Sequence, residues 1–325
     1  MHLNKVNTYT NVYETLSKKL KWKVSDKRIL MTIASIYVMN NQELDTERFI
    51  NIADQIKAQA GLFSSMKSES RYTTAATLDV YFDDPISKIP TLFELYDIFR
   101  KQKFASGNFT YIAATVLLTN ENRAQQPTGI IRRAKEIFDD MRKEHLFLTG
   151  YEDYPLATLL ALEDRPGIIA HIEKYYEELN KSGFSKGNDL QFLSHILSLE
   201  KEASVHDLVS RCSHIHDAFQ GAGIRPKKSY YPVIGILALL PPAEVDMDSI
   251  REMYEALNSE IKWQKEMNVI LAVSLFVKEK LEDNGLTEAS IQITLEAILQ
   301  AQQAVMVSTI AASTAAASAS NNGSS

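Results

Sequence analysis

The chain has 325 residues, of which 45% are hydrophobic and 23% are charged, with a formal net charge of −6. This balance excludes the polar, highly charged class of disordered proteins. A single cysteine, Cys212, excludes an intrachain disulfide, and no apolar run approaches the roughly 18 residues of a membrane-spanning helix. The first residues also lack the continuous apolar stretch of a secretory signal, so we expect a cytoplasmic protein with no membrane insertion.

The charge is unevenly distributed. Residues 1–28 hold seven Lys or Arg side chains against Glu14 and Asp26, so this segment carries about +5 and the remainder about −11. A largely acidic body repels phosphate backbones, which argues against nucleic acid as the main partner. Basic stretches at Lys18–Arg28 and Arg225–Lys228 could touch phosphate or anionic lipid, but acidic neighbours favour solvent exposure.

Residues 1–25 have the spacing of an amphipathic helix, which we predict to be a capping helix at one end of the molecule. An apolar pattern at positions i, i+3, i+4 and i+7 then returns seven times, at steps of 38 to 43 residues. This spacing places four side chains on one face of a helix. The seven copies are Phe49–Ile56, Leu92–Phe99, Ala134–Met141, Ile172–Leu179, Cys212–Phe219, Ile250–Leu257 and Ile291–Ile298.

A second, shorter stretch precedes each copy by 15 to 21 residues and is apolar on all sides. Small residues in it predict a buried helix that its neighbours approach closely. The stretches are Ile33–Ile36, Ala75–Leu78, Ala113–Val116, Ala157–Leu160, Ser194–Leu197, Ile234–Leu237 and Ala272–Leu275. Each unit of the repeat is therefore a predicted hairpin, with a uniformly apolar first helix and an amphipathic second helix.

Glycine and proline mark the expected helix ends. Gly61, Gly183 and Gly223 each precede an apolar residue, which is typical of a left-handed C-terminal cap closed by an apolar contact. Prolines fall between first and second helices, at or near a helix start, where a missing N–H costs least. They are Pro85, Pro90, Pro127, Pro166, Pro241 and Pro242.

A period near 40 residues predicts an all-α fold, a right-handed α-solenoid of about seven hairpins of the HEAT or tetratricopeptide kind. We expect one helical-repeat domain over residues 26–310. Residues 311–325 are a low-complexity run of Ala, Ser, Asn and Gly, which predicts a disordered tail.

Two sets of residues could carry function. His195, Cys212, His214 and His216 cluster in sequence, and the i, i+4 spacing of Cys212 and His216 could hold Zn²⁺. Both residues also occupy core positions of the repeat, which favours a buried cysteine and a core histidine.

The second set is Tyr72, Tyr111, Tyr154 and Tyr231, near the starts of four first helices. Their rings could line a concave groove and hold a peptide, or they could pack between hairpins.

Catalytic and nucleotide-binding motifs are absent: the sequence has no GxGxxG, Walker A, GxSxG, HExxH or paired CxxC pattern. We therefore predict no cofactor and favour a non-enzymatic scaffold that binds a protein or peptide in its concave face. The alternatives are a metal-binding protein or enzyme centred on the His/Cys cluster and, third, nucleic-acid binding.

Two resemblances accompany this interpretation. The second helices, such as Ala134–Met141, resemble those of pentatricopeptide repeats over about 15 residues, although the period here is longer. The segment from Lys27–Ile29 through Phe63–Tyr72 into Ala75–Asp79 is similar to an uncharacterised bacterial family, a domain of unknown function of about this length. That likeness implies a cytoplasmic bacterial protein with no assigned activity, so it transfers no functional residues.

Overall fold

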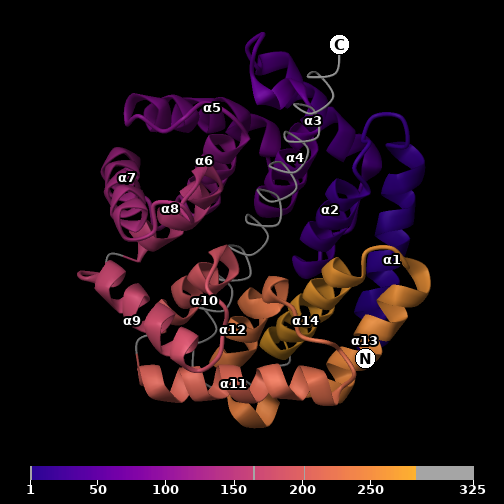
Figure 1. Cartoon of the computed structure of the whole chain (residues 1–325). Helices are drawn as coiled ribbons and strands as arrows, with labels where there is room; N and C mark the ends of the chain where they lie inside the picture. Colours follow the sequence, from indigo (N-terminus) through magenta and orange to yellow (C-terminus); the bar gives the residue numbers. More distant parts are fainter. Residues whose placement is uncertain (1, 164, 201, 283–325) are drawn as a thin grey trace, which may run out of the picture. The chain divides into compact units, whose positions relative to one another are not determined.

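A computed structural model describes residues 2–163, 165–200 and 202–282 of the chain (Figure 1). Within these ranges the protein consists of fourteen α-helices and four short 3-10 turns, with no strand. The predicted all-α class is confirmed. None of the helices described here combines the length and the apolar character that crossing a bilayer requires.

The helices alternate in length and composition along the chain. The predicted first helices are the even-numbered ones: α2 (Lys27–Met39), α4 (Ser70–Tyr81), α6 (Asn108–Thr119), α8 (Tyr154–Leu162), α10 (Asn188–Ser198), α12 (Tyr231–Leu239) and α14 (Lys265–Glu282). The predicted second helices are α3 (Thr46–Gln59), α5 (Pro85–Lys101), α7 (Pro127–Glu144), α9 (Ile168–Lys181), α11 (Val205–Gly221) and α13 (Met247–Glu260). Helix α1 (His2–Lys19) precedes them all.

The described chain divides into two compact units. One holds residues 11–163 and the other holds residues 2–10 and 165–282; we call them the 11–163 unit and the 165–282 unit. The expected boundaries, a capping helix at 1–25 and a single domain over 26–310, stay predictions. The expected tail at 311–325 lies outside the described residues.

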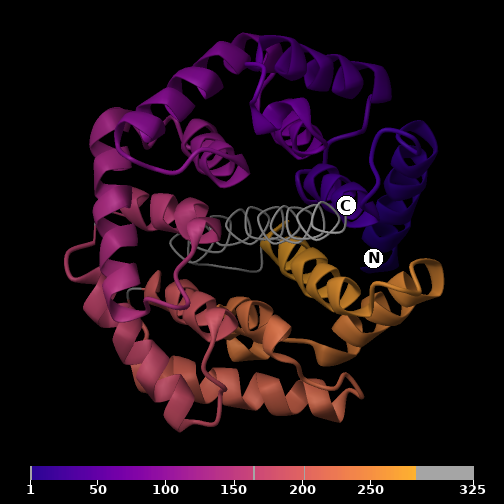
Figure 2. The ribbon, with the colours of Figure 1, turned by 45° about the horizontal axis from the view of Figure 1, so that its top comes forward.

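In the 11–163 unit the helices form two layers. The first helices α2, α4, α6 and α8 each pack on the next one, and the second helices α3, α5 and α7 do the same. Each second helix also packs on the first helix that follows it in the chain, as α3 does on α4. These helices run from indigo to magenta in Figure 2. The apolar core therefore lies between the layers.

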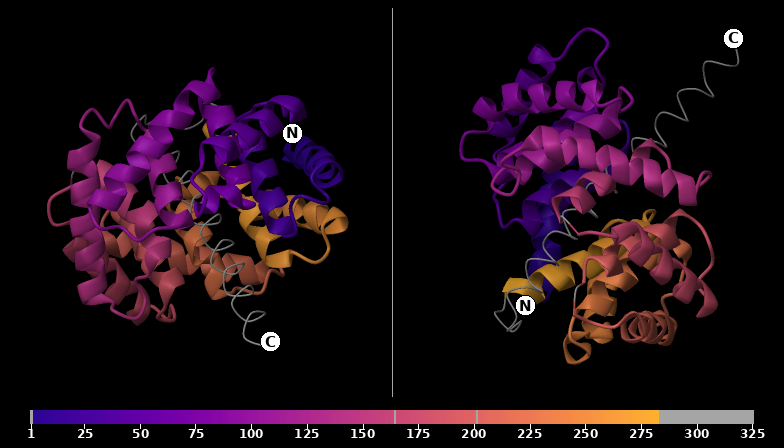
Figure 3. Two further views of the ribbon diagram at one scale, coloured as in Figure 1. Left: turned by 90° about the horizontal axis from the view of Figure 1, so that it is seen from above. Right: turned by 90° about the vertical axis from the view of Figure 1, so that its left-hand side faces the viewer.

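The 165–282 unit repeats this pattern. Helices α10, α12 and α14 form one layer, α9 packs on α11, and each second helix packs on the next first helix (Figure 3). Gly235 in α12 shows why small residues are needed, because a Cβ added there would lie 2.5 Å from Leu193 Cδ1 of α10. The small side chains of the first helices thus permit close packing.

The periodic quartets lie where the sequence predicts. Six of them fall on α3, α5, α7, α9, α11 and α13, and the seventh, Ile291–Ile298, lies outside the described residues. Their side chains are buried except for Tyr96, His216 and Tyr254, which are half-buried. Burying four such side chains contributes roughly 6 to 12 kcal/mol per hairpin before chain entropy is subtracted. The first helices are also buried almost throughout, as their uniform composition predicts.

Helix starts follow the expected chemistry. Pro85 and Pro127 begin α5 and α7, where the missing N–H has no helical partner to lose. Pro90 instead lies inside α5, in its second turn. Asp45 and Asp246 accept hydrogen bonds from backbone N–H groups of the first turns of α3 and α13, so they serve as N-caps.

Second helices end in two ways. In α5, α9 and α11 a residue with positive φ follows the helix, and the next residue donates its N–H five positions back; Lys103 (φ 68°), Gly183 (φ 99°) and Gly223 (φ 77°) hold these positions. The apolar residues that follow, Phe104, Phe184 and Ile224, are buried. We call these the buried-tip connections.

The predicted cap at Gly61 is wrong. Helix α3 ends at Gln59, and the next residue, Ala60, is extended (φ −64°, ψ 135°) and donates its N–H to Ile56 O. The chain therefore leaves the helix without turning inward, and Leu62 and Phe63 are exposed. In the described chain, helices α1, α7 and α13 are likewise followed by no residue of positive φ, and we call the connections after these four helices the exposed-tip connections.

Candidate functional site

The four candidate tyrosines are buried at the starts of α4, α6, α8 and α12; at most 5% of each side chain is exposed. Burial raises the pKa of Tyr72, Tyr111 and Tyr154 above the usual value. Their rings contact other aromatic rings: Tyr111 stacks on Tyr96 at a centroid distance of 3.9 Å, and Tyr154 meets Phe138 edge-on at 4.7 Å. Such contacts hold hairpins together.

Three of the four hydroxyls hydrogen-bond to the connection that leads into the preceding hairpin. Tyr154 accepts a hydrogen bond from the N–H of Ala105 at 3.1 Å, and Tyr231 accepts one from the N–H of Ser185 at 3.1 Å. The hydroxyl of Ser64 donates to that of Tyr111 at 3.0 Å. The three tyrosines thus fix connections at one repeat position, and a role for them in binding a partner stays a prediction.

Tyr72 is held differently. The Arg71 guanidinium lies 4.2 Å over its ring and donates from Nη2 to the hydroxyl at 2.8 Å. Arg71 itself is buried, and Nη1 donates to the carbonyls of Lys67 and Ser68. This pair therefore anchors the end of the α3–α4 connection on the start of α4.

The His/Cys candidates lie on two helices of the 165–282 unit. His195 (α10) and Cys212 (α11) are buried, His216 is half-buried with its ring against Phe184, and His214 is exposed. Burial raises the pKa of the Cys212 thiol, which disfavours the thiolate that binds Zn²⁺. Among the described residues, no group of three or more His, Cys, Asp and Glu side chains is placed to hold a metal ion.

The largest exposed apolar side chains lie in the exposed-tip connections. In the 11–163 unit Trp22 is 89% exposed, Leu62 81%, and Phe63 and Phe147 97% each. Large apolar side chains gathered on one part of a surface mark interaction sites more often than isolated ones do. The sequence contains a pattern that could have identified these positions. A large aromatic residue recurs at steps of 37 to 43 residues, at Trp22, Phe63, Phe104, Phe147 and Phe184. Sequence reasoning missed them because it assigned the apolar residue after a second helix to the core.

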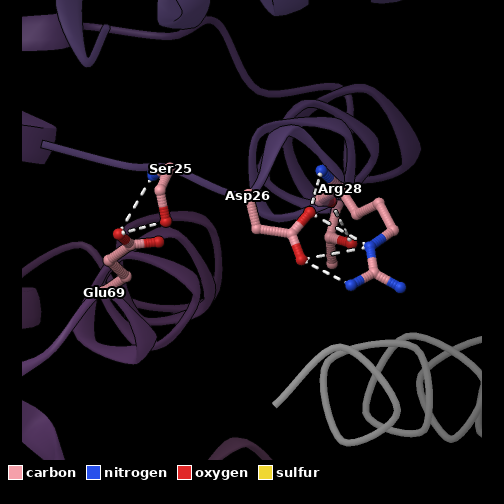
Figure 4. A network of polar contacts seen from close by, with 5 residues as sticks. Ser25, Asp26, Arg28 and Glu69 are labelled. Atoms are coloured by element: carbon pink, nitrogen blue, oxygen red, sulfur yellow. Dashed lines mark hydrogen bonds and ion pairs between the residues drawn. The ribbon is translucent and has the colours of Figure 1, made fainter. Parts of the chain in front are cut away.

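Hydrogen bonds place the first two exposed tips on one edge of the 11–163 unit. The N–H and hydroxyl of Ser25, in the α1–α2 connection, both donate to Glu69 Oε1 at the start of α4, at 3.0 and 2.9 Å (Figure 4). Trp22 and Phe63 belong to the two connections that this contact joins.

Asp26 completes the α1–α2 connection. Its carboxylate caps α2 through the N–H of Arg28 at 2.9 Å and pairs with the Arg28 guanidinium, with 2.6 Å between Nη2 and Oδ2 (Figure 4). Burial opposes ionisation here, but the hydrogen bonds from Arg28 lower the pKa of Asp26 below its usual value. The connection that carries Trp22 is therefore fixed at its α2 end, both to α2 itself and to the start of α4.

This edge is basic. Residues 18–25 contain four lysines and no acidic residue, and residues 57–71 contain Lys57, Lys67 and Arg71 against Glu69 alone. We call residues 18–25 and 57–67 the basic aromatic edge. Lys18, Lys19, Lys21, Lys23 and Lys57 are exposed, and Lys21 Nζ lies 5.0 Å from the centre of the Trp22 ring.

The opposite ends of the same helices are acidic. Glu43, Asp45, Asp83 and Asp84 precede α3 and α5 there. This edge is joined by ion pairs between neighbouring hairpins, such as Arg48 with Asp79 at 2.6 Å and Lys88 with Glu121 at 2.7 Å. Tyr37 also donates to Asp79 at 2.6 Å. The 11–163 unit thus carries opposite charge at its two edges.

Comparisons with known proteins agree with the expected likeness to an uncharacterised family. The family model described as "Protein of unknown function (DUF4003)" matches residues 12–304. The uncharacterised protein YeaA of Bacillus subtilis (strain 168) is 36% identical over 317 residues, which cover 96% of this chain and 95% of YeaA. No solved structure matches the chain. With most of its length matched, the chain belongs to the DUF4003 family.

Proposed function

We propose that the protein is a non-enzymatic helical-repeat scaffold that binds a protein segment or peptide along its layer of first helices. The layered packing of first on first and second on second helices within each unit supports this. In the proposal the hairpins form one right-handed α-solenoid of about seven repeats in the cytoplasm, and the first helices line its concave face.

One observation carries the proposal. Ile112 and Val116 of α6 and Leu159 of α8 form an apolar cluster on two neighbouring first helices, and the partly buried Phe109 and Leu162 pack against it. The three central side chains are buried, so the accessible apolar anchor points are Phe109 and Leu162 at the rim of the cluster. These two lie on neighbouring first helices, an arrangement that an amphipathic helix or extended peptide can use. Tyr111 and Tyr154, at the starts of the same helices, keep α6 and α8 in place.

Site-specific photo-crosslinking in the native cell tests this proposal. The full chain carries p-benzoylphenylalanine at Phe109 or Leu162, where a partly exposed large side chain is already accommodated. We expect a discrete protein adduct from both positions. The matched control carries the same group at Phe147, which is an exposed tip. Adducts from the control alone, or from none of the three positions, would contradict binding on the first helices.

A separate measurement decides the metal-binding alternative. Elemental analysis of the purified full chain is expected to find no stoichiometric metal. Zinc that survives dialysis, and is lost in a His195→Ala or Cys212→Ala variant that still folds, would replace the scaffold with the metal-binding interpretation.

A further inference from the structure

We propose that the basic aromatic edge of the 11–163 unit docks on the headgroup region of an anionic lipid bilayer, as a peripheral contact that spans nothing. Two properties of this edge together favour a bilayer as the partner. Large apolar side chains are exposed on short connections, and the same connections and helix ends carry lysines. This surface is separate from the first-helix cluster assigned to a protein partner.

The apolar part has the size and form of an interfacial anchor. Trp22, Leu62 and Phe63 are each more than four-fifths exposed, and they sit at the tips of two connections that the Ser25–Glu69 bonds hold together. Aromatic side chains, tryptophan above all, prefer the boundary between headgroups and acyl chains. Their exposure costs the protein solubility unless such a surface receives them.

The charged part complements an anionic surface. Five exposed lysines belong to the basic aromatic edge, and it contains no acidic residue. Glu69, just beyond it in the α3–α4 connection, is bonded to Ser25. Basic side chains in the last turn of a helix also complement its dipole, which accounts for Lys18, Lys19 and Lys57. The dipole does not account for Lys21 and Lys23, which lie beyond the end of α1 on either side of Trp22. Each lysine near an anionic membrane adds to its attraction.

The acidic opposite edge gives this docking a direction. An anionic bilayer attracts the basic aromatic edge and repels the edge that holds Asp83 and Asp84, so the 11–163 unit has one favoured orientation. A lysine-rich surface with no exposed aromatic residue would fit any polyanion. The added tryptophan and phenylalanine favour a partner with an apolar interior below its charged surface.

The test uses the full chain and vesicles of phosphatidylcholine, alone or mixed with phosphatidylglycerol. We expect cosedimentation with the mixed vesicles only, weakening as salt rises. Both Trp22→Ala with Phe63→Ala and Lys21→Glu with Lys23→Glu should weaken binding about tenfold or more. Two control variants should leave binding within about twofold. Ile86→Ala removes an exposed apolar side chain at the acidic edge, and Arg132→Glu with Lys174→Glu makes an equal charge change at exposed helix positions.

Tryptophan fluorescence separates the lipid from other anions. Trp263→Phe leaves Trp22 as the sole tryptophan of the chain. We expect its emission to shift to the blue on the mixed vesicles and to be quenched by brominated acyl chains, with no change on polyglutamate. The proposal is overturned if vesicles do not bind, if both edge variants bind like the parent, or if polyglutamate alone moves the emission, which would indicate an acidic protein partner.

Discussion

The α3–α4 and α5–α6 connections of the 11–163 unit occupy equivalent places in the repeat, and each carries a phenylalanine at the same position. The two phenylalanine side chains differ in exposure. Phe63 in the first is 97% exposed, whereas Phe104 in the second is fully buried. Each is followed by a residue that hydrogen-bonds to the tyrosine of the first helix after the next one. Ser64, before α4, bonds to Tyr111 of α6, and Ala105, before α6, bonds to Tyr154 of α8. The difference therefore arises before the tip, at the end of the second helix.

Backbone conformation at one or two residues explains the contrast. Lys103 is left-handed, so the chain turns back and Phe104 donates its N–H to Phe99 O, which brings its ring within 4.8 Å of Phe99 and 4.6 Å of Tyr154. Ala60 is extended, so Phe63 points away from the core. A buried-tip connection is thus held by a phenylalanine or isoleucine side chain packed in the core. An exposed-tip connection is held by polar contacts that leave its aromatic residue on the surface.

The largest expected difference is in stability. Phe104→Ala should lower the free energy of unfolding by about 3 to 5 kcal/mol, because a fully buried ring and its aromatic contacts are lost. Phe63→Ala should change it by less than about 0.5 kcal/mol. Urea denaturation of the full chain measures both. Similar losses in the two variants would mean that Phe63 packs in solution.

The α7–α8 connection, which carries the third exposed tip, should make the stability of the protein depend on pH. Burial raises the pKa of Asp153, which accepts the N–H of Gly150 at 2.9 Å, to about 7. The folded state then binds more protons than the unfolded state between pH 4 and 7, so stability present at low pH is lost as pH rises through about 7.

We expect a loss of about 1 to 2 kcal/mol between pH 5 and pH 7, seen as a shift of the urea midpoint. Asp153→Asn should remove this pH dependence while keeping an acceptor for Gly150. A parent chain as stable at pH 7 as at pH 5 would show that the carboxyl is ionised throughout.

A smaller effect should follow from removing a hydroxyl that holds a connection. Tyr154→Phe loses the bond from the N–H of Ala105 and leaves that partly buried group without its partner, so it should cost about 1 kcal/mol. Tyr151→Phe is the matched control, because its side chain is about half exposed. Thermal unfolding followed by circular dichroism compares the two variants. An equal loss of stability in both would show that the Tyr154 hydroxyl does not stabilise the α5–α6 connection.

The smallest effects should come from the backbone, with opposite signs. Lys103→Gly should stabilise the protein by about 0.5 to 1 kcal/mol, because glycine adopts positive φ without strain. Ala60→Gly should destabilise it by a similar amount, since an extended residue gains nothing from glycine and the unfolded chain gains freedom. Denaturant midpoints report both, and stabilisation by the two substitutions alike would show that both helices end in the same way.

The candidate site was only partly predictable from sequence. The apolar residue at the tip recurs with the period of the hairpins, so its position in each repeat is visible in the chain. Its exposure is not, because Gly61 reads as a left-handed cap although the chain there is extended. The buried tyrosines show the same limit: a ring at the start of a helix fits a groove or a hairpin contact, and only the hydroxyl partners distinguish the two.

The sequence by itself determined the all-α class, the alternation of first and second helices and the buried face of each, because these depend on local spacing and on side chains close in the chain. Only the tertiary structure decided which tips are exposed and that Trp22 shares an edge with Phe63. The shared edge depends on a contact between residues more than 40 positions apart, Ser25 with Glu69, which no local pattern encodes. The exposure of a tip follows from the backbone conformation at the helix end, which the residue types Gly61 and Lys103 do not reveal.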